Sequence, residues 1–130
     1  MKITGFDVVD LRVPTSDHLL GSDPFHKEPD YSSAVLYLNT DEGIQGVSVV
    51  FTVGAGTDWI CYGISDLCQL VVDTDLAEFA DSPFRLYQRL IDHHQLRWLH
   101  DGVFRMAAGA VLNAMWDLWA KQQQKPLWKL

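Results

Sequence analysis

Residues 103–123 are apolar on almost every face of a helix and are rich in small side chains. A helix that is hydrophobic all round is buried, so this segment restricts the chain to folds with a central helix. Its small residues let another backbone approach closely; they are Ala107, Ala108, Gly109, Ala110 and Ala114. Trp116 and Trp119 follow, and Lys125-Pro126 ends the segment. We therefore expect one central, buried helix over residues 103–123.

Three segments in the first half of the chain have strand character. Residues 3–13 alternate apolar and charged side chains, which is typical of a half-buried strand; the apolar face is expected to hold Val9, Leu11 and Val13. Residues 34–38 and 47–53 form two further apolar runs. The turn residues 39–43 between them predict a hairpin, so these two strands should pair antiparallel.

Two more helices are indicated between the strands and the central helix. Gly54-Ala55-Gly56 breaks the third strand, and Thr57 is suited to cap a helix that follows; its apolar positions are Ile60, Ile64, Leu67, Cys68 and Val71. Ser82-Pro83 predicts a second start, and the residues expected on one face of that helix are Phe84, Tyr87, Leu90, Ile91 and His94. The fold class is therefore α+β: a three-stranded antiparallel sheet followed by a bundle of three to four helices, packed on one face of the sheet.

Charge and hydropathy exclude several classes of partner. The formal net charge is −7 and the basic residues are scattered, so the basic patch of a nucleic-acid-binding protein is missing. No window approaches 18 uninterrupted apolar residues, and Asp7 falls where a signal peptide would be apolar. We expect a cytoplasmic protein that binds neither nucleic acid nor a membrane.

The two cysteines are not expected to form a disulfide. Cys61 and Cys68 are seven residues apart on one predicted helix, which places their Cα atoms about 10 Å apart along the axis. A disulfide needs less than about 7 Å. Two buried free thiols are the favoured interpretation, with a redox role as the alternative.

Known catalytic and metal-binding motifs find no match. His93 and His94 are adjacent and His100 lies six residues on, whereas two ligands from one helix need a spacing of three or four. Gly54 and Gly56 lack the third glycine of a dinucleotide-binding turn. There is no Walker A sequence, no G-x-S-x-G and no C-x-x-C. We therefore predict no catalytic residue and no metal ligand in this chain.

Asn113 and Asp117 are the polar exceptions on the central helix. They are four residues apart and should share a buried face. Hydrogen bonding to neighbouring backbone or to an arginine is the favoured role, and catalysis is the alternative.

A long polar loop is the more promising place for binding. Residues 15–32 are rich in Ser, Asp, Gly, Pro and His and have no periodicity, and loops this long in compact domains are functional or disordered. The segments 21–23 and 30–31 offer amides, a hydroxyl, carboxylates and a phenol, which are the donors and acceptors that a polyhydroxylated substrate needs.

Beyond these inferences, the chain resembles a known family along essentially its whole length. The end of the central helix, Trp116-Asp117-Leu118 with Lys121, followed by Lys125-Pro126-Leu127, resembles the N-terminal domain of the mandelate racemase and muconate lactonizing enzyme group of the enolase superfamily. Several shorter segments are similar to the L-fuconate dehydratase branch of that family; they are Pro14-Thr15-Ser16, Gly21-Ser22-Asp23, Pro29-Asp30-Tyr31-Ser32, Phe51-Thr52-Val53-Gly54 and Gln95-Leu96-Arg97-Trp98. Dehydratases for other six-carbon sugar acids share most of this pattern.

The resemblance implies a capping domain with the enolase N-terminal fold. In such enzymes the cap closes over a (β/α) barrel that carries Mg²⁺, and the barrel removes water from a sugar acid, a lyase reaction. By the same resemblance, residues 1–124 are the cap, residues 125–130 begin the linker into the barrel, and the longer enzyme is a homo-oligomer. Cofactors are then absent from this chain, and its partners are the barrel and a sugar acid such as L-fuconate.

Residue by residue, the resemblance also gives a binding site. Gly21, Ser22, Asp23 and Tyr31 fall where the first cap loop of the family contacts substrate, and residues 52–57 fall where the second loop lies. The barrel residues that perform the chemistry have no counterpart here, so we expect no turnover from this chain alone. The alternative is a stand-alone, non-catalytic binding or assembly module derived from such a cap.

Overall fold

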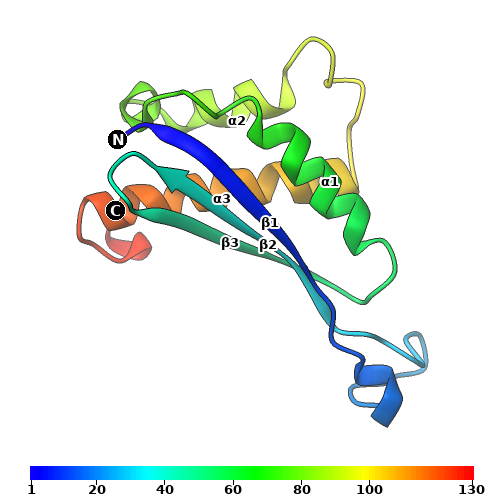
Figure 1. Ribbon diagram of the computed structural model, residues 1–130. Coiled ribbons are helices and arrows are strands. Elements are labelled where there is room, and N and C mark those ends of the chain that lie inside the picture. The colour runs from blue at the N-terminus through cyan, green and yellow to red at the C-terminus, as the bar shows by residue number, and fades with distance from the viewer.

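Three antiparallel strands come first in the fold, and the helices follow. The computed structural model describes the backbone of residues 1–130 and every side chain except that of residue 83. The strands are β1 (Ile3–Leu11), β2 (Ser32–Thr40) and β3 (Gln45–Thr52), and the α-helices are α1 (Thr57–Cys68), α2 (Pro83–Ile91) and α3 (Val103–Gln122). Single 3-10 turns lie at η1 (Thr15–His18), η2 (Leu76–Phe79) and η3 (Leu127–Lys129). The predicted α+β class and element order are confirmed (Figure 1).

The sheet has the order β1-β2-β3, with β2 in the centre and both pairs antiparallel. Val9, Val35 and Val49 lie side by side across it, which fixes the register of all three strands. The predicted hairpin between β2 and β3 is confirmed. Its turn uses Gly43 at a φ of 74°, a conformation that glycine adopts without strain.

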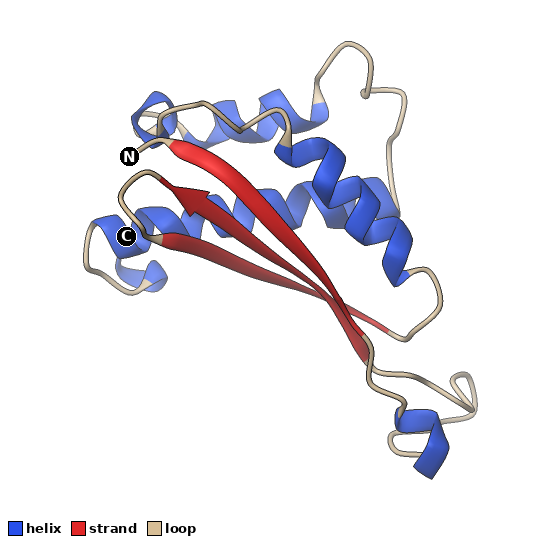
Figure 2. Cartoon of the chain, in the orientation of Figure 1, coloured by secondary structure: helices blue, strands red, loops and turns tan.

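The α-helices lie on one side of the sheet, as Figure 2 shows. Three residues of β2 point into this layer and are fully buried; they are Ala34, Leu36 and Leu38. The predicted central helix is confirmed as α3. Its small residues allow the backbones of β3 and α1 to approach closely. A Cβ added to Gly46 of β3 would lie 2.3 Å from the carbonyl oxygen of Ala114. A Cβ added to Gly63 of α1 would lie 3.1 Å from the Cβ of Ala107.

The expected buried face of β1 was wrong. Val9, Leu11 and Val13 are 44%, 50% and 42% exposed, whereas Phe6 and Val8 pack against the core. The alternation itself was correct, but only one face of this sheet is covered by helices. Both faces of β1 carry apolar residues, so the pattern alone could not identify the covered one.

Details of the first two helices also differ from the prediction. Thr57 is the first residue of α1 and Gly56, at a φ of 89°, is its N-cap, so Thr57 does not cap the helix. Helix α2 begins after Ser82 as predicted and ends at Ile91, before His94. Among its described side chains, Leu86 and Leu90 are buried, whereas Phe84 is 61% exposed.

None of the helices in the described part of the chain combines the length and the apolar character that a membrane crossing requires.

Candidate substrate-binding loops

The first candidate loop, residues 15–31, extends from the end of the sheet opposite to both termini (Figure 1). Its tip, residues 17–28, is exposed throughout. Its base is closed by Thr15, whose Oγ1 donates to the carbonyl of Pro29 at 2.6 Å and accepts from the Tyr31 amide at 2.9 Å. The loop therefore has a tied base and a solvated tip.

Ser16 and Asp30 form a second tie across this base. The amide and the hydroxyl of Ser16 both donate to Oδ1 of Asp30, at 3.1 and 2.6 Å. These hydrogen bonds hold the pKa of Asp30 below its ordinary value, because they favour the ionised carboxylate. Asp30 is therefore an anionic, structural part of the loop base.

Two of the four predicted substrate-binding residues meet directly. The phenol of Tyr31 donates to the carbonyl of Gly21 at 2.6 Å. The ring of Tyr31 also lies 5.5 Å from that of Phe51, measured between centroids. A Cβ added to Gly21 would lie 2.3 Å from the Tyr31 ring, so a larger residue there would displace the ring, and the φ of 72° also favours glycine. This contact ties the tip of the loop to its base.

The other two predicted residues, Ser22 and Asp23, are engaged within the tip. The Ser22 hydroxyl donates to the carbonyl of Leu19 at 3.1 Å. Oδ1 of Asp23 accepts from the amides of Phe25 and His26, both at 2.7 Å. The same hydrogen bonds, from His26 first and then Phe25, hold the pKa of Asp23 below its ordinary value. Asp23 is thus a fixed carboxylate at an exposed turn.

The second candidate loop joins β3 to α1. The hydroxyl of Thr57 donates to the carbonyl of Gly54 at 2.6 Å and lies 2.7 Å from the hydroxyl of Thr52. Gly54 has a φ of 113°, and a Cβ there would lie 3.0 Å from Cβ of Asp30 in the first loop. The amide of Asp30 donates to the carbonyl of Val53 at 3.3 Å. The two loops are therefore in direct contact.

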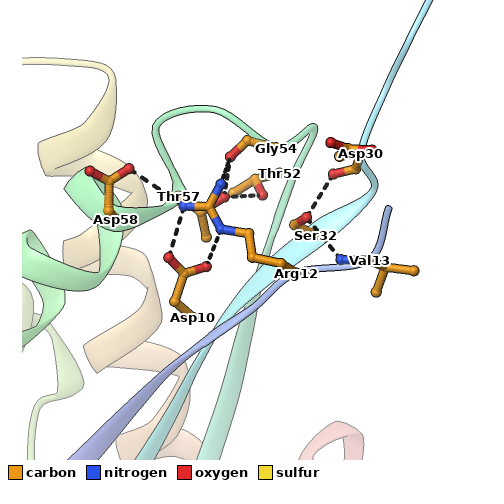
Figure 3. Close-up of polar contacts among 9 residues, drawn as sticks. All are labelled: Asp10, Arg12, Val13, Asp30, Ser32, Thr52, Gly54, Thr57 and Asp58. Atoms are coloured by element: carbon orange, nitrogen blue, oxygen red, sulfur yellow. Dashed lines mark hydrogen bonds and ion pairs between the residues drawn. The ribbon is translucent and has the colours of Figure 1, made fainter. Parts of the chain in front are cut away.

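Arg12, at the end of β1, lies between these loops and was missed by the sequence reasoning (Figure 3). Its guanidinium contacts both carboxylate oxygens of Asp10 and donates from Nη1 to the carbonyl of Gly54 at 2.6 Å. The hydrogen bond with Asp10 raises the pKa of Arg12 above its ordinary value. In the sequence Arg12 looked like one charge on the polar side of a strand. The only signal was its pairing with Asp10 two residues earlier, on the same face.

Of the two polar residues on α3, Asp117 has a structural role. Oδ2 of Asp117 accepts from the amide of Val47 at 2.7 Å and pairs with Nζ of Lys121 at 2.6 Å. Asp117 therefore fastens β3 to α3, which is the favoured role of the two considered. Asn113 is exposed, so its expected burial was wrong.

The cysteine interpretation is confirmed in its main point, since Cys61 and Cys68 are free. Cys68 is buried, and burial raises the pKa of its thiol to about 12. Cys61 is only partly buried, which corrects the expectation of two buried thiols. Neither environment favours a reactive thiolate.

The described residues do not fit a magnesium site. No group of three or more His, Cys, Asp or Glu side chains comes together among them in an arrangement that could hold a metal ion. The carboxylates of the loop base are already engaged by Ser16 and Arg12.

Residues 13–130 match the family described as mandelate racemase / muconate lactonizing enzyme, N-terminal domain. The solved structure of human mitochondrial enolase superfamily member 1 is 41% identical, with a TM-score of 0.93 over 98% of this chain and 30% of that one. L-galactonate dehydratase of Hypocrea jecorina is 38% identical over all of this chain and 29% of its own. The chain thus spans about 30% of the length of the curated relatives it matches.

More distant enzymes share the fold. L-talarate dehydratase from Polaromonas sp. JS666, solved with Mg and L-glucarate, has a TM-score of 0.68 over 94% of this chain and 30% of that one, at 20% identity. At this identity the likeness concerns the fold alone.

Proposed function

Because the chain belongs to the mandelate racemase/muconate lactonizing enzyme family, whose N-terminal domain its residues 13–130 match, we propose that it is the capping domain of a magnesium-dependent sugar-acid dehydratase. The observation that carries the proposal is the meeting of two polar loops at one end of the sheet. The similarity to L-galactonate dehydratase supports the class of reaction. The longer enzyme then removes water from a sugar acid to give a 2-keto-3-deoxy acid.

The first loop supplies hydrogen-bond acceptors to substrate. Ser22 and Tyr31 each donate their single hydroxyl proton to a backbone carbonyl, so the oxygen of each is left to accept. Asp23 is held ionised: its Oδ1 accepts from the two amides of its turn and its Oδ2 lies 3.2 Å from Nδ1 of His26, and both oxygens keep further lone pairs. Such a surface suits the hydroxyl groups of a sugar acid, whereas Asp23 repels the carboxylate end. We therefore assign the loop to the polyol end of the substrate.

The substrate we propose is L-fuconate or the related L-galactonate. The two acids have the same configuration and differ only in the hydroxyl at carbon 6, so they form a matched pair of probes. A loop that presents acceptors should bind the additional hydroxyl of L-galactonate at little cost. The segments shared with the L-fuconate dehydratase branch favour the first acid, and the curated relative favours the second.

We assign this chain no proton transfer. Its part in the reaction is to hold the substrate and to exclude water from the reacting carbon, which lengthens the life of a charged intermediate. The magnesium ion, which stabilises negative charge when bound, would be held by a barrel beyond residues 1–124. The segment 125–130 would begin the linker into that barrel.

Exposed apolar residues near residue 130 support the docking of a second domain. Leu127, Trp128 and Leu130 are 51%, 79% and 45% exposed. An open hollow of about 420 Å³ beside them is lined by Trp116 and Trp119 of α3. Apolar patches of this kind mark interaction sites. We propose that the barrel covers them, and that the assembled enzyme is a homo-oligomer.

The first experiment reads the coding sequence beyond the codon for Leu130. A frame that continues into a barrel with spaced Asp and Glu ligands supports the dehydratase. A stop codon there would refute it in favour of the stand-alone binding module. The encoded enzyme is then incubated with Mg²⁺ and each of the two acids, and the 2-keto product is trapped with semicarbazide. If neither acid gives product, this substrate class is rejected.

The role of the first loop is tested by Asp23→Asn and Tyr31→Phe in the active enzyme. Each weakens or removes one acceptor, so we expect kcat/KM to fall about fivefold, the effect of about 1 kcal/mol. Asp17→Asn is the matched control, because Asp17 is exposed in the same loop but lies outside the predicted site. Unchanged kinetics in both site variants would show that the loop does not contact the substrate.

A further inference from the structure

The contacts around Arg12 carry an inference about how the two loops are held. Asp10 lies near the end of β1 and Arg12 follows the end of that strand, two residues further on, where its guanidinium forms a bidentate pair with the carboxylate. This pairing uses Nε and Nη2 and fixes the plane of the guanidinium. The remaining nitrogen, Nη1, is thereby aimed at the carbonyl of Gly54 in the second loop (Figure 3).

The carbonyl of Gly54 is the point at which several elements converge. It accepts from Arg12, which directly follows β1, and from the hydroxyl and amide of Thr57, the first residue of α1, at 2.6, 2.6 and 3.2 Å. Asp58, in the first turn of α1, lies 3.5 Å from Nη2 of Arg12. Gly54 has a φ of 113°, so the orientation of this part of the loop depends on glycine.

The second stem of the first loop is fastened to the same place. The amide of Val13, next to Arg12, donates to the hydroxyl of Ser32 at 3.3 Å, and that hydroxyl donates to the carbonyl of Asp30 at 2.7 Å. The amide of Asp30 in turn donates to the carbonyl of Val53. Both stems of the first loop therefore reach the second loop, one through Arg12 and the other through Asp30.

We propose that Arg12 is a positioning residue that fastens the two loops into one unit, so that displacement of either loop displaces the other. The coupling is a property of this chain and does not depend on the reaction. If the proposed function also holds, substrate contact at the first loop is transmitted to the second loop through these stems.

The proposal is tested by amide hydrogen exchange in the full chain, followed by mass spectrometry. Arg12→Met keeps the aliphatic stem of the side chain but loses every donor. We expect exchange to accelerate about three- to tenfold in both loops, 15–31 and 53–57, while the amides of central strand β2 are unchanged. This is the size expected for one charge-assisted hydrogen bond at a half-exposed site. Arg85→Met is the matched control, because Arg85 is exposed on α2 at a distance from both loops (Figure 1).

Arg12→Lys gives a graded variant. Lysine keeps the positive charge but lacks the planar fork, so it cannot pair with Asp10 in two-point fashion and reach Gly54 at once. We expect amide exchange rates in both loops that lie between those of the wild type and those of Arg12→Met. If Arg12→Met fails to fold, this variant and the next one carry the test.

Reciprocity provides the decisive experiment. Thr15→Val preserves shape but removes both hydrogen bonds of the Thr15 hydroxyl at the base of the first loop. Coupled loops require that the amide of Thr57, in the second loop, then exchanges faster as well. Acceleration confined to residues 15–31 in Thr15→Val, or to residues 53–57 in Arg12→Met, would overturn the proposal. Neither result involves catalysis, so failure of the dehydratase assignment would be seen separately, in the product assay.

Discussion

Replacing Gly46 with alanine should weaken the fold by a large and specific amount. The added Cβ would lie 2.3 Å from the carbonyl oxygen of Ala114 and 2.6 Å from Cγ of Leu118. Ordinary carbon–oxygen contacts are about 3.3 Å or longer, so β3 and α3 must separate by about 1 Å. The backbone oxygen cannot rotate away as a side chain would, and α3 packs on β2 and α1 as well.

The magnitude follows from the cost of overpacking a core. Such substitutions cost about 1–3 kcal/mol, and a clash with backbone belongs at the upper end. The entropy of unfolding for a chain of this length makes about 3 kcal/mol equivalent to a fall of about 10 °C in Tm. Thermal unfolding followed by circular dichroism, with urea titration as a second probe, measures both quantities.

Gly109→Ala is the matched control, because it is the same chemical change on the helix that Gly46 contacts. A Cβ at Gly109 meets nothing within 4 Å, and alanine is favoured over glycine inside a helix by about 0.5–1 kcal/mol. This variant should therefore raise Tm by about 2–4 °C. A Gly46→Ala protein as stable as the wild type would refute the argument that this contact sets the spacing between sheet and helix.

Three further outcomes are expected. In native protein at pH 8, iodoacetamide should leave Cys68 unlabelled and modify Cys61 only slowly, because burial raises the pKa of both thiols; rapid labelling of Cys68, read by mass spectrometry, would contradict its burial. Asp117→Ala should lower the free energy of unfolding by about 1–2 kcal/mol in urea titrations, since the amide of Val47 loses its acceptor, whereas Asp117→Asn should cost less. The pKa of Asp30 is lower in the folded loop than in the unfolded chain. Its contribution to loop order is therefore complete above the ordinary pKa near 3.8 and is lost as pH falls through the lowered value. The Ser16 amide resonance should shift with this titration, and the shift should be absent in Asp30→Asn.

The elements of the fold could be predicted where the residues of a segment allow only one secondary structure and one degree of burial. The small and aromatic residues of 103–123 favour a helix that is mostly buried, and the structure buries Ala107, Ala110 and Ala114 accordingly, while Met106 and Asn113 are exposed. The turn between β2 and β3 has its own local chemistry and was equally readable. These predictions succeeded because the physical cause lay within the segment itself.

The failures came where the cause lay in another segment. Both faces of β1 carry apolar residues, and only the placement of the helices decides that Val9 is exposed while Val8 packs on the core. On α2, the choice of Leu86 over Phe84 as a buried residue likewise depends on what the helix packs against. The role of Arg12 depends on Gly54, which lies 42 residues away. The predicted contacts of Ser22 and Asp23 with substrate stay a prediction.

The exposed tip of the first loop has a consequence for how such a domain can diverge. Residues 17–28 bury nothing in the core, and the loop is closed at its base by residues 15, 16, 30 and 31. Substitutions at exposed positions usually change stability by no more than about 0.5 kcal/mol, and doubling a loop's length costs only about 0.6 kcal/mol. Apart from Gly21, which must accommodate the Tyr31 ring, the tip can accept new side chains or insertions while the scaffold stays intact. Under the proposed function, a lineage could therefore exchange the ligand it recognises in small steps, without passing through a sequence that no longer folds.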